Sequence, residues 1–260
     1  YFGLRYLGAV APGYRADMLV LEDLETVDVK DVYSRGDKVV NSKKMIDMKA
    51  PQVSENLRRI VLNSFHTGNL TEKDFHIDEK SEKCRVIKLI PGQLVTEEII
   101  QGINWDKNNG VDLERDILKL AVIERHKNTG HKGLGFINGI GLKKGAIASS
   151  VSHDSHNLIV IGTNEKDMAI AANHICSVGG NVVVADGEII AQMSLPIAGL
   201  MSEVSGEEIA IENETVRKSV YGLGVPEDVE PFMNMAFVSL SVIPSLKMTT
   251  LGLVDVDKQE

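Results

Sequence analysis

The chain has 260 residues, of which 43% are hydrophobic and 25% are charged, as is usual for a soluble globular protein. Its net charge of -9 leaves no basic excess to meet phosphates, which argues against a general binder of nucleic acid or of membrane surfaces. Cys84 and Cys176 are too far apart for a CxxC zinc pair and fit a reducing compartment, so we expect a cytoplasmic protein.

The N-terminal stretch predicts a small β unit. The chain opens with Tyr1 and not with Met, so we expect a fragment or a processed chain. Met18–Leu21 is an apolar run, Val27 and Val29 alternate with charged residues, and a turn at Gly36 precedes further valines. These strands are too few to form an independent sheet.

The middle of the chain is less clearly patterned. Residues 41–80 are polar, and "NSKKMIDMKAPQ" within them reads as a connector. "CRVIKLIPG" at 84–92 predicts a strand that ends at Pro91-Gly92. "DILKLAVIERH" at 116–126 fits a buried strand or a helix, and the turn-rich residues after it favour the strand. The glycine-rich run 133–139 is interpreted as packing or a turn, because its spacing is not GxGxxG.

The region after residue 145 is the clearest part of the chain. Asn164 is the predicted N-cap of a helix with an apolar stripe that ends at Gly179. Asp186-Gly187 predicts the turn of a β-hairpin. Ser205 and Glu208 predict a capping box at the start of a second helix, which runs to about Gly222. Strands and helices in this order indicate an α+β or mixed α/β fold.

"SHDSHN" at 152–157 lies between two predicted strands and is the strongest candidate site. Asp, Ser and Asn are good turn formers, but turn chemistry does not explain two histidines. Asp154 and His156 would share one face of an extended segment, so the carboxylate could orient the imidazole. We assign auxiliary catalytic roles to His153, Asp154 and His156, with His153 nearest the substrate or its water, and substrate binding to Asn157.

"ERHKNTGHKG" at 124–133 is a second polar cluster at the end of an apolar run. If the run is a strand, Glu124 and His126 share one face and Arg125 points to the other. A solvated strand end is the simpler interpretation of this cluster. The functional alternative makes Glu124 and His126 substrate-binding residues on a loop held by a rigid strand.

A metal site inside this chain is not expected. A metal centre needs three or four converging ligands, and the segment 152–157 offers at most two histidines and one aspartate. The other histidines are scattered, and His174 on the first predicted helix has a packing or surface role. We therefore predict no metal ligand and no resident cofactor among these residues.

Two sets of motifs carry a resemblance to known families. "LGAVAPGYRADMLVLEDLETVDVKDVYSRGDKVV" resembles the segment that closes the small β-sandwich after the barrel of amidohydrolases. "GLGFINGIGLKKGAIASSVSHDSHNLIVIGTN" and "PFMNMAFVSLSVIPSLKMTTLGLVDV" resemble the C-terminal domain of the adenine deaminase family, as do "DILKLAVIERH" and "LPIAGLMS". The resemblance covers nearly the whole chain.

The resemblance implies the C-terminal part of a hydrolase that converts adenine to hypoxanthine and ammonia in purine metabolism. Residues 1–48 would be β-sandwich strands, and residues 49–260 an α+β domain. The TIM-type catalytic barrel of the family, with its manganese or iron ligands, matches no position here, so we expect the isolated chain to be inactive. Implied partners are adenine, the barrel and further copies of the chain. The alternative is a stand-alone, non-catalytic module for ligand binding or oligomerisation.

Overall fold

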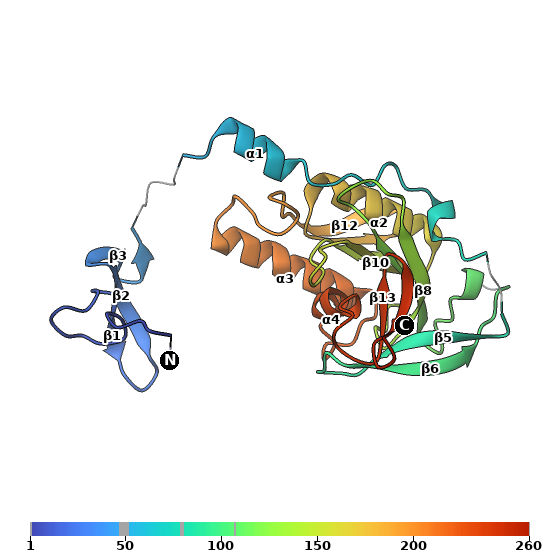
Figure 1. Ribbon diagram of the computed structural model, residues 1–260, viewed down its shortest axis with the longest axis horizontal. Coiled ribbons are helices and arrows are strands. Elements are labelled where there is room, and N and C mark those ends of the chain that lie inside the picture. Colours follow the sequence, from blue (N-terminus) through green and yellow to red (C-terminus); the bar gives the residue numbers. More distant parts are fainter. Residues whose placement is uncertain (1, 47–51, 79–80, 107, 260) are drawn as a thin grey trace. The chain divides into compact units, whose positions relative to one another are not determined.

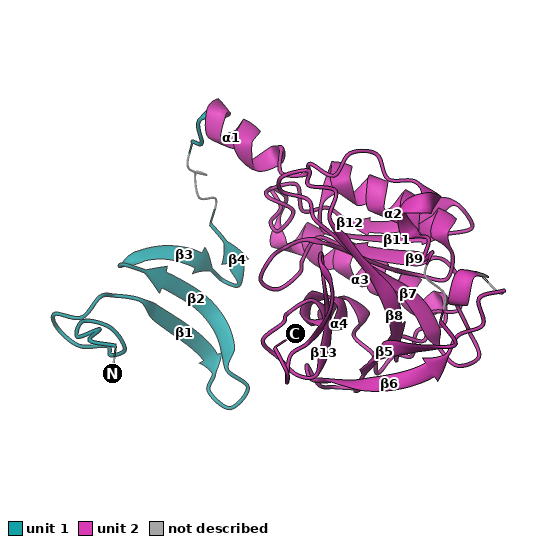
Figure 2. Ribbon diagram, turned by 45° about the vertical axis from the view of Figure 1, so that its right-hand side comes forward, with its two compact units in different colours: residues 1–54 teal, residues 55–260 magenta. Residues whose placement is uncertain are grey.

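The computed structural model describes residues 2–46, 52–78, 81–106 and 108–259, and it divides the chain into two compact units (Figure 2). The units comprise residues 1–54 and 55–260. The domain boundary predicted between residues 48 and 49 lies outside the described residues. No helix of the described residues has the length and apolar character needed to cross a lipid bilayer.

The first unit is a four-stranded antiparallel sheet in chain order. It confirms the strands predicted before residue 41 and adds a short strand, Lys44–Met45, in the stretch predicted as a connector. Its strands are β1 (Met18–Asp23), β2 (Asp28–Ser34), β3 (Asp37–Asn41) and β4 (Lys44–Met45). Arg35 and Gly36 form the predicted turn between β2 and β3 with φ angles of 52° and 92°. Leu19 and Val20 remain 58% and 42% exposed, so this sheet buries little apolar surface by itself.

The second unit is built on an eight-stranded sheet with the order β12-β11-β9-β10-β7-β8-β5-β6. All neighbours in this sheet are antiparallel except β5 and β8, which are parallel. Its strands are β5 (Lys83–Leu89), β6 (Thr96–Gly102), β7 (Ile117–Ile123), β8 (Lys132–Asn138), β9 (Ala146–Ser149), β10 (Leu158–Gly162), β11 (Asn181–Ala185) and β12 (Glu188–Met193).

Helices and a small hairpin complete the second unit. They are α1 (Glu55–Leu62), η1 (Glu72–Phe75), η2 (Asn108–Gly110), α2 (Glu165–Val178), α3 (Gly206–Gly222), α4 (Pro231–Val238), β13 (Leu246–Thr249) and β14 (Gly252–Asp255). In Figure 1, α2 and α3 lie on different sides of the sheet. The α+β fold class is therefore confirmed, and the described residues contain no TIM-type barrel.

The two faces of the sheet bury separate hydrophobic clusters. Along β7, Leu118, Leu120 and Val122 pack in a cluster with residues of α3, α4 and β13. Ala121 and Ile123 pack in another cluster with residues of α2. Successive side chains of a strand point to opposite faces, so one continuous apolar run supplies both cores. The strand interpretation of residues 116–126 is confirmed.

The predicted turn and capping residues form the expected contacts. Asn164 caps α2 by accepting a hydrogen bond from the N–H of Asp167 at 2.8 Å, and Gly179 ends the helix at a φ of 68°. Ser205 and Glu208 form the predicted capping box of α3. Asp186 and Gly187 have φ angles of 55° and 84° in the hairpin between β11 and β12.

The glycine-rich run 133–139 is mostly strand β8, and its glycines serve close packing. A Cβ atom on Gly133 would lie 2.0 Å from the carbonyl oxygen of Thr249 in β13. Packing, one of the two interpretations of this run, is confirmed, and Gly139 after the strand lies in a bend with a φ of 100°. The sequence patterns also missed α1, β6 and the C-terminal hairpin β13–β14.

Candidate functional site

The two polar clusters singled out in the sequence meet in the folded chain. Nε2 of His126 lies 2.7 Å from the carbonyl oxygen of Ser155. The guanidinium Nε of Arg125 donates a hydrogen bond to the carbonyl oxygen of His156. β7 and β10 pair antiparallel, with Ile123 opposite Leu158, so the segment after β7 and the segment before β10 lie at the same end of these two strands.

Buried serines fasten the loop that connects β9 to β10. Ser150 accepts a hydrogen bond from the N–H of Gly180 at 2.7 Å and donates to the carbonyl oxygen of Gly199 at 2.6 Å. The hydroxyl oxygens of Ser152 and Ser239 lie 2.6 Å apart, and both residues are buried. Satisfied buried polar groups of this kind hold a loop in one conformation.

His153 and Asp154 form the exposed part of the loop. Nδ1 of His153 lies 3.2 Å from a carboxylate oxygen of Asp154, and the side chains are 49% and 86% exposed. The His153 ring stacks on Phe237 of α4 with ring centroids 4.8 Å apart. Asp154 therefore lies against His153, whereas the sequence interpretation paired it with His156. An imidazole with a carboxylate neighbour and access to water can exchange a proton.

His156 is the more enclosed of the two imidazoles. Its Nδ1 is buried and has no hydrogen-bond partner among the described residues. Burial lowers the pKa of His156, and the positive charge of Arg125 lowers it further, so the neutral ring is favoured. The ring centroids of His153 and His156 lie 6.3 Å apart. The two imidazoles are therefore neighbours in different environments, His153 exposed and His156 enclosed.

A cavity of about 290 Å³ lies beside this loop, and most of the residues that line it are polar, with no lysine or arginine among them. The lining consists of Val122, Asp154, Ser155, Asn157, Ser239, Leu240, Ser241, Val242, Thr249 and Thr250. The side-chain carbonyl of Asn157 is buried without a hydrogen-bond partner among the described residues. Hydroxyls, an amide and a single carboxylate suit a small neutral ligand that carries both donors and acceptors.

Glu124 shapes the neighbouring loop. Its carboxylate accepts hydrogen bonds from the N–H groups of His126, Lys127 and Thr129 at 2.5, 2.9 and 3.0 Å. Burial raises the pKa of this carboxyl, but the hydrogen bonds from Thr129, His126 and Lys127 outweigh it and lower the pKa to about 2. The carboxylate is thus largely engaged by its own loop. The substrate-binding role assigned to it stays a prediction.

Arg125 is the residue that the sequence interpretation undervalued. It is 1% exposed, and its guanidinium stacks over Phe65 at 4.3 Å from the ring centroid. Its position in the sequence could have indicated its burial. Arg125 lies two residues after Ile123, and alternate residues of a strand point to the same face, so Arg125 was expected on the face that packs against α2. A charged residue at an in-phase position signals a buried, hydrogen-bonded group.

The donor set of the described residues does not fit a metal centre. No group of three His, Cys, Asp or Glu side chains in residues 2–46, 52–78, 81–106 and 108–259 lies close enough to hold a metal ion. In the loop itself, the buried Nδ1 of His156 and the exposed pair of His153 and Asp154 lie in different environments.

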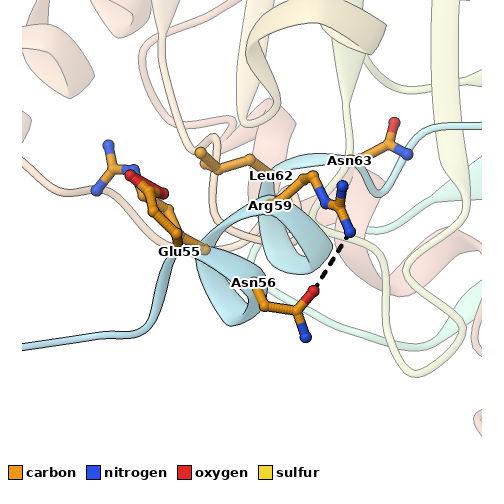
Figure 3. A pocket seen from close by; sticks show the side chains of 6 residues that line it. Glu55, Asn56, Arg59, Leu62 and Asn63 are labelled. Atoms are coloured by element: carbon orange, nitrogen blue, oxygen red, sulfur yellow. Dashed lines mark hydrogen bonds between the residues drawn. The ribbon is translucent and has the colours of Figure 1, made fainter.

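A further hollow of about 670 Å³ lies alongside helix α1 (Figure 3). Its lining consists of Glu55, Asn56, Arg58, Arg59, Leu62 and Asn63, and Arg59 donates to Asn56 at 3.3 Å. No residue of α1 is buried, and none of the predicted site residues lines this hollow. Its location therefore adds nothing to the candidate site.

Comparison with known proteins gives a consistent result. Residues 93–260 match the family model described as the adenine deaminase C-terminal domain. The chain is 45% identical over 262 residues to adenine deaminase 2 of Carboxydothermus hydrogenoformans. This match covers 98% of the chain and 45% of that protein. It is 44% identical over 265 residues to the adenine deaminase of Brucella abortus, covering 100% of the chain and 44% of that protein.

The chain spans less than half the length of these curated relatives. The family model nevertheless covers well over half of the chain, and the resemblance noted in the sequence is confirmed. The chain belongs to the family defined by the adenine deaminase C-terminal domain.

Proposed function

We propose that the chain is the C-terminal part of a metal-dependent hydrolase that deaminates adenine to hypoxanthine and ammonia, in purine salvage or adenine catabolism in the cytoplasm. The match of residues 93–260 and the names of the relatives support this assignment. The chain spans only part of those relatives, so we assign the reaction to the complete protein and expect the isolated chain to be inactive.

We assign the metal, manganese or iron, to a TIM-type barrel in the complete protein. The described residues of this chain hold no suitable ligand cluster. The contribution of the chain is limited to what its own side chains can do, which is to position a ligand, exclude water and move protons. We also propose a homo-oligomer as the working assembly.

The polar cavity beside residues 152–157 is the observation that carries the functional role. Its lining has no lysine or arginine, which suits a neutral molecule such as adenine or hypoxanthine. In this proposal Asn157 binds the substrate, with Glu124 and His126 on the adjoining loop. His153, with Asp154 at its Nδ1, transfers protons between solvent and the substrate or its water. His156 stays neutral because it is partly buried beside Arg125.

A complete enzyme that carries this domain tests the proposal. His153→Ala should lower kcat for adenine by about a hundredfold or more, since a general acid–base group contributes roughly that much. His156→Ala should also lower kcat, because it removes the imidazole beside His153. The metal content measured on the same samples should stay unchanged. His131→Ala, which removes another exposed histidine, is the matched control. Unchanged kcat in both loop variants, with normal thermal stability, would assign the loop a structural role only.

The rival is a stand-alone, non-catalytic module for ligand binding or oligomerisation. The self-contained hydrophobic core of residues 55–260 favours it, because such a unit can fold without a barrel. The length of the relatives favours the enzyme. Finding the chain expressed in cells at its own length, without a barrel, would support the module. Finding it as the end of one continuous polypeptide with a barrel would support the enzyme.

A further inference from the structure

The eight-stranded sheet of the second unit is open between β5 and β8. β5 pairs with β6 along all seven of its residues, and β8 pairs with β7 in the same way. β5 and β8 pair with each other at only three positions, beginning with Val86 opposite Phe136. Among the described residues, the N-terminal halves of these two parallel strands therefore have no strand partner on the sides that face each other.

A cavity of about 430 Å³ occupies this opening. Cys84 and Arg85 of β5 line it together with Leu134 and Gly135 of β8. These are the residues that the ladder would place opposite each other if it continued beyond Val86. The volume lies within the range of roughly 300–1,000 Å³ that is typical of small-molecule sites.

Aromatic and aliphatic side chains form most of the rest of the lining, which also includes Ser81 and Lys83. Trp105 and Phe136 meet edge to face with ring centroids 5.8 Å apart, and Ile77 and Leu253 also line the cavity. The indole Nε1 of Trp105 donates to the carbonyl oxygen of Ser81 at 2.8 Å, which fixes the ring. An aromatic lining of this kind favours a flat ligand that can stack on it.

The unpaired halves of β5 and β8 determine which hydrogen-bonding groups a ligand in this cavity must carry. Every second residue of a strand directs its N–H and C=O toward the neighbouring strand, so an unpaired half presents both donors and acceptors. A pure hydrocarbon would leave these groups without partners. A flat ring with alternating donors and acceptors along its edge satisfies them. A continuous peptide strand does not fit, because the ladder beginning at Val86 closes the opening at one end.

The charges of the lining favour a neutral ligand. Arg85 donates to Glu98 at 2.7 Å and to Asp255 at 2.8 Å, so its positive charge is already matched. Lys83, the other cation of the lining, is exposed to water. A phosphate would find no desolvated, unmatched cation there.

We propose that this cavity binds a neutral, planar heteroaromatic base of the purine type, in a site separate from residues 152–157. The base lies between the unpaired halves of β5 and β8, and Trp105 contacts its ring. The inference stands on the geometry of this cavity and does not require the deaminase proposal. It can be tested on the chain of residues 1–260 alone.

Trp105 provides the first measurement, because it is the only tryptophan in the chain. Adenine and hypoxanthine should quench its fluorescence in a saturable way, whereas hydantoin, a non-aromatic ring with similar edge groups, should not. By calorimetry, Trp105→Ala should weaken adenine binding by about tenfold, as is typical for the loss of a base-stacking partner. Trp105→Phe, which keeps an aromatic ring, is the matched control and should bind within about twofold of the parent chain.

The two cysteines provide a second measurement that needs no variant. Cys84 lines the cavity, whereas Cys176 lies on α2 against Thr67, with their side chains 3.3 Å apart. Saturating adenine should slow alkylation of Cys84 by iodoacetamide at least fivefold and leave the rate at Cys176 unchanged. Mass spectrometry of the two peptides measures both rates in one sample.

Four outcomes would overturn the inference. The first is that neither base binds. The second is that adenine binds without protecting Cys84 and with equal affinity in Trp105→Ala. The third is that Asn157→Ala abolishes binding, which would move the base to the loop of residues 152–157. Tighter binding of adenosine monophosphate than of adenine would also contradict a site for a neutral base. A failure of the complete enzyme to deaminate adenine would leave all these measurements unaffected.

Discussion

Arg125 and His156 are joined by a hydrogen bond in which the guanidinium Nε of Arg125 donates to the backbone carbonyl oxygen of His156. The same guanidinium donates to the carbonyl oxygen of Ser64 at 3.0 Å and to that of Ala198 at 2.9 Å. One buried side chain therefore fastens three segments that are far apart in sequence, including the loop with the candidate site. The geometry of this loop depends on the residue at position 125.

Arg125→Met should lower the free energy of unfolding by about 3 kcal/mol, because it leaves buried carbonyl groups without a donor. Urea unfolding followed by circular dichroism measures the change. Arg59→Met on the exposed face of α1 is the matched control and should change stability by less than about 0.5 kcal/mol. Equal stability of both variants would show that other donors or water replace the guanidinium.

Ser152 and Ser239 should be energetically coupled, because their hydroxyl oxygens lie 2.6 Å apart in a buried environment. Each alanine variant leaves one hydroxyl without its partner, whereas the double variant removes both groups. A double-mutant cycle on urea unfolding should give a coupling free energy of about 1 kcal/mol. Strict additivity of the two single changes would mean that the hydroxyls find other partners.

His156 should make stability depend on pH below neutrality. Its pKa in the folded chain is lowered from 6.5, mainly by burial, so the unfolded chain takes up the proton first as the pH falls. The stability associated with the neutral ring is present above about pH 6.5 and is lost as the pH falls through the lowered folded-state pKa. The free energy of unfolding of His156→Gln should therefore fall less than that of the parent between pH 7 and about pH 5. Parallel curves for the two chains would contradict the enclosed position of this imidazole.

Glu124 should contribute in a lower pH range. Hydrogen bonds from its own loop hold the pKa at about 2, against 4.5 for the free group. Its contribution is present above pH 4.5 and is lost as the pH falls toward 2. Glu124→Gln removes this titration, so acid unfolding of the variant should have a shallower pH dependence below pH 4.5 than that of the parent. The two chains should show the same slope from pH 5 to 7, and a difference there would contradict the assignment.

The second unit should fold without the first. Residues 55–260 contain their own hydrophobic clusters, which are formed by side chains of the sheet and of the helices that cover it. Deletion of residues 1–54 should leave a cooperative thermal transition and the far-ultraviolet spectrum of an α+β domain. Loss of cooperativity on deletion would mean that the two units form one folding unit, and the proposed domain division would then be wrong.

Local chemistry explains which elements were predictable. Asn164 and Ser205 each hold a helix start through contacts within three residues, and Asp186-Gly187 adopts a turn that few other pairs favour. β7 was predictable as a strand because its apolar run is short and a turn follows it. In each case the decisive interaction lies within a few residues of sequence, where a single chain can be read directly.

The residues of the candidate site were also visible in the sequence, because two histidines beside an aspartate exceed what a turn requires. Their pairing was not visible. His153 stacks on Phe237, whereas the backbone carbonyl of His156 accepts a hydrogen bond from Arg125. The two histidines therefore lie in different environments, and Phe237 and Arg125 both come from distant segments of the chain. No period-two argument could include those contacts, since the loop is not a strand.

By itself, the sequence determined the α+β class, the caps, the hairpin turn and the family, because these depend on short-range patterns and characteristic motifs. Only the tertiary structure decided that Gly133 packs against the carbonyl of Thr249, that Arg125 is buried, and that β5 separates from β8 to leave a cavity beside Trp105. Each of these features is a contact between segments distant in the chain. Such contacts depend on how strands and loops pack in space, which local propensity does not encode.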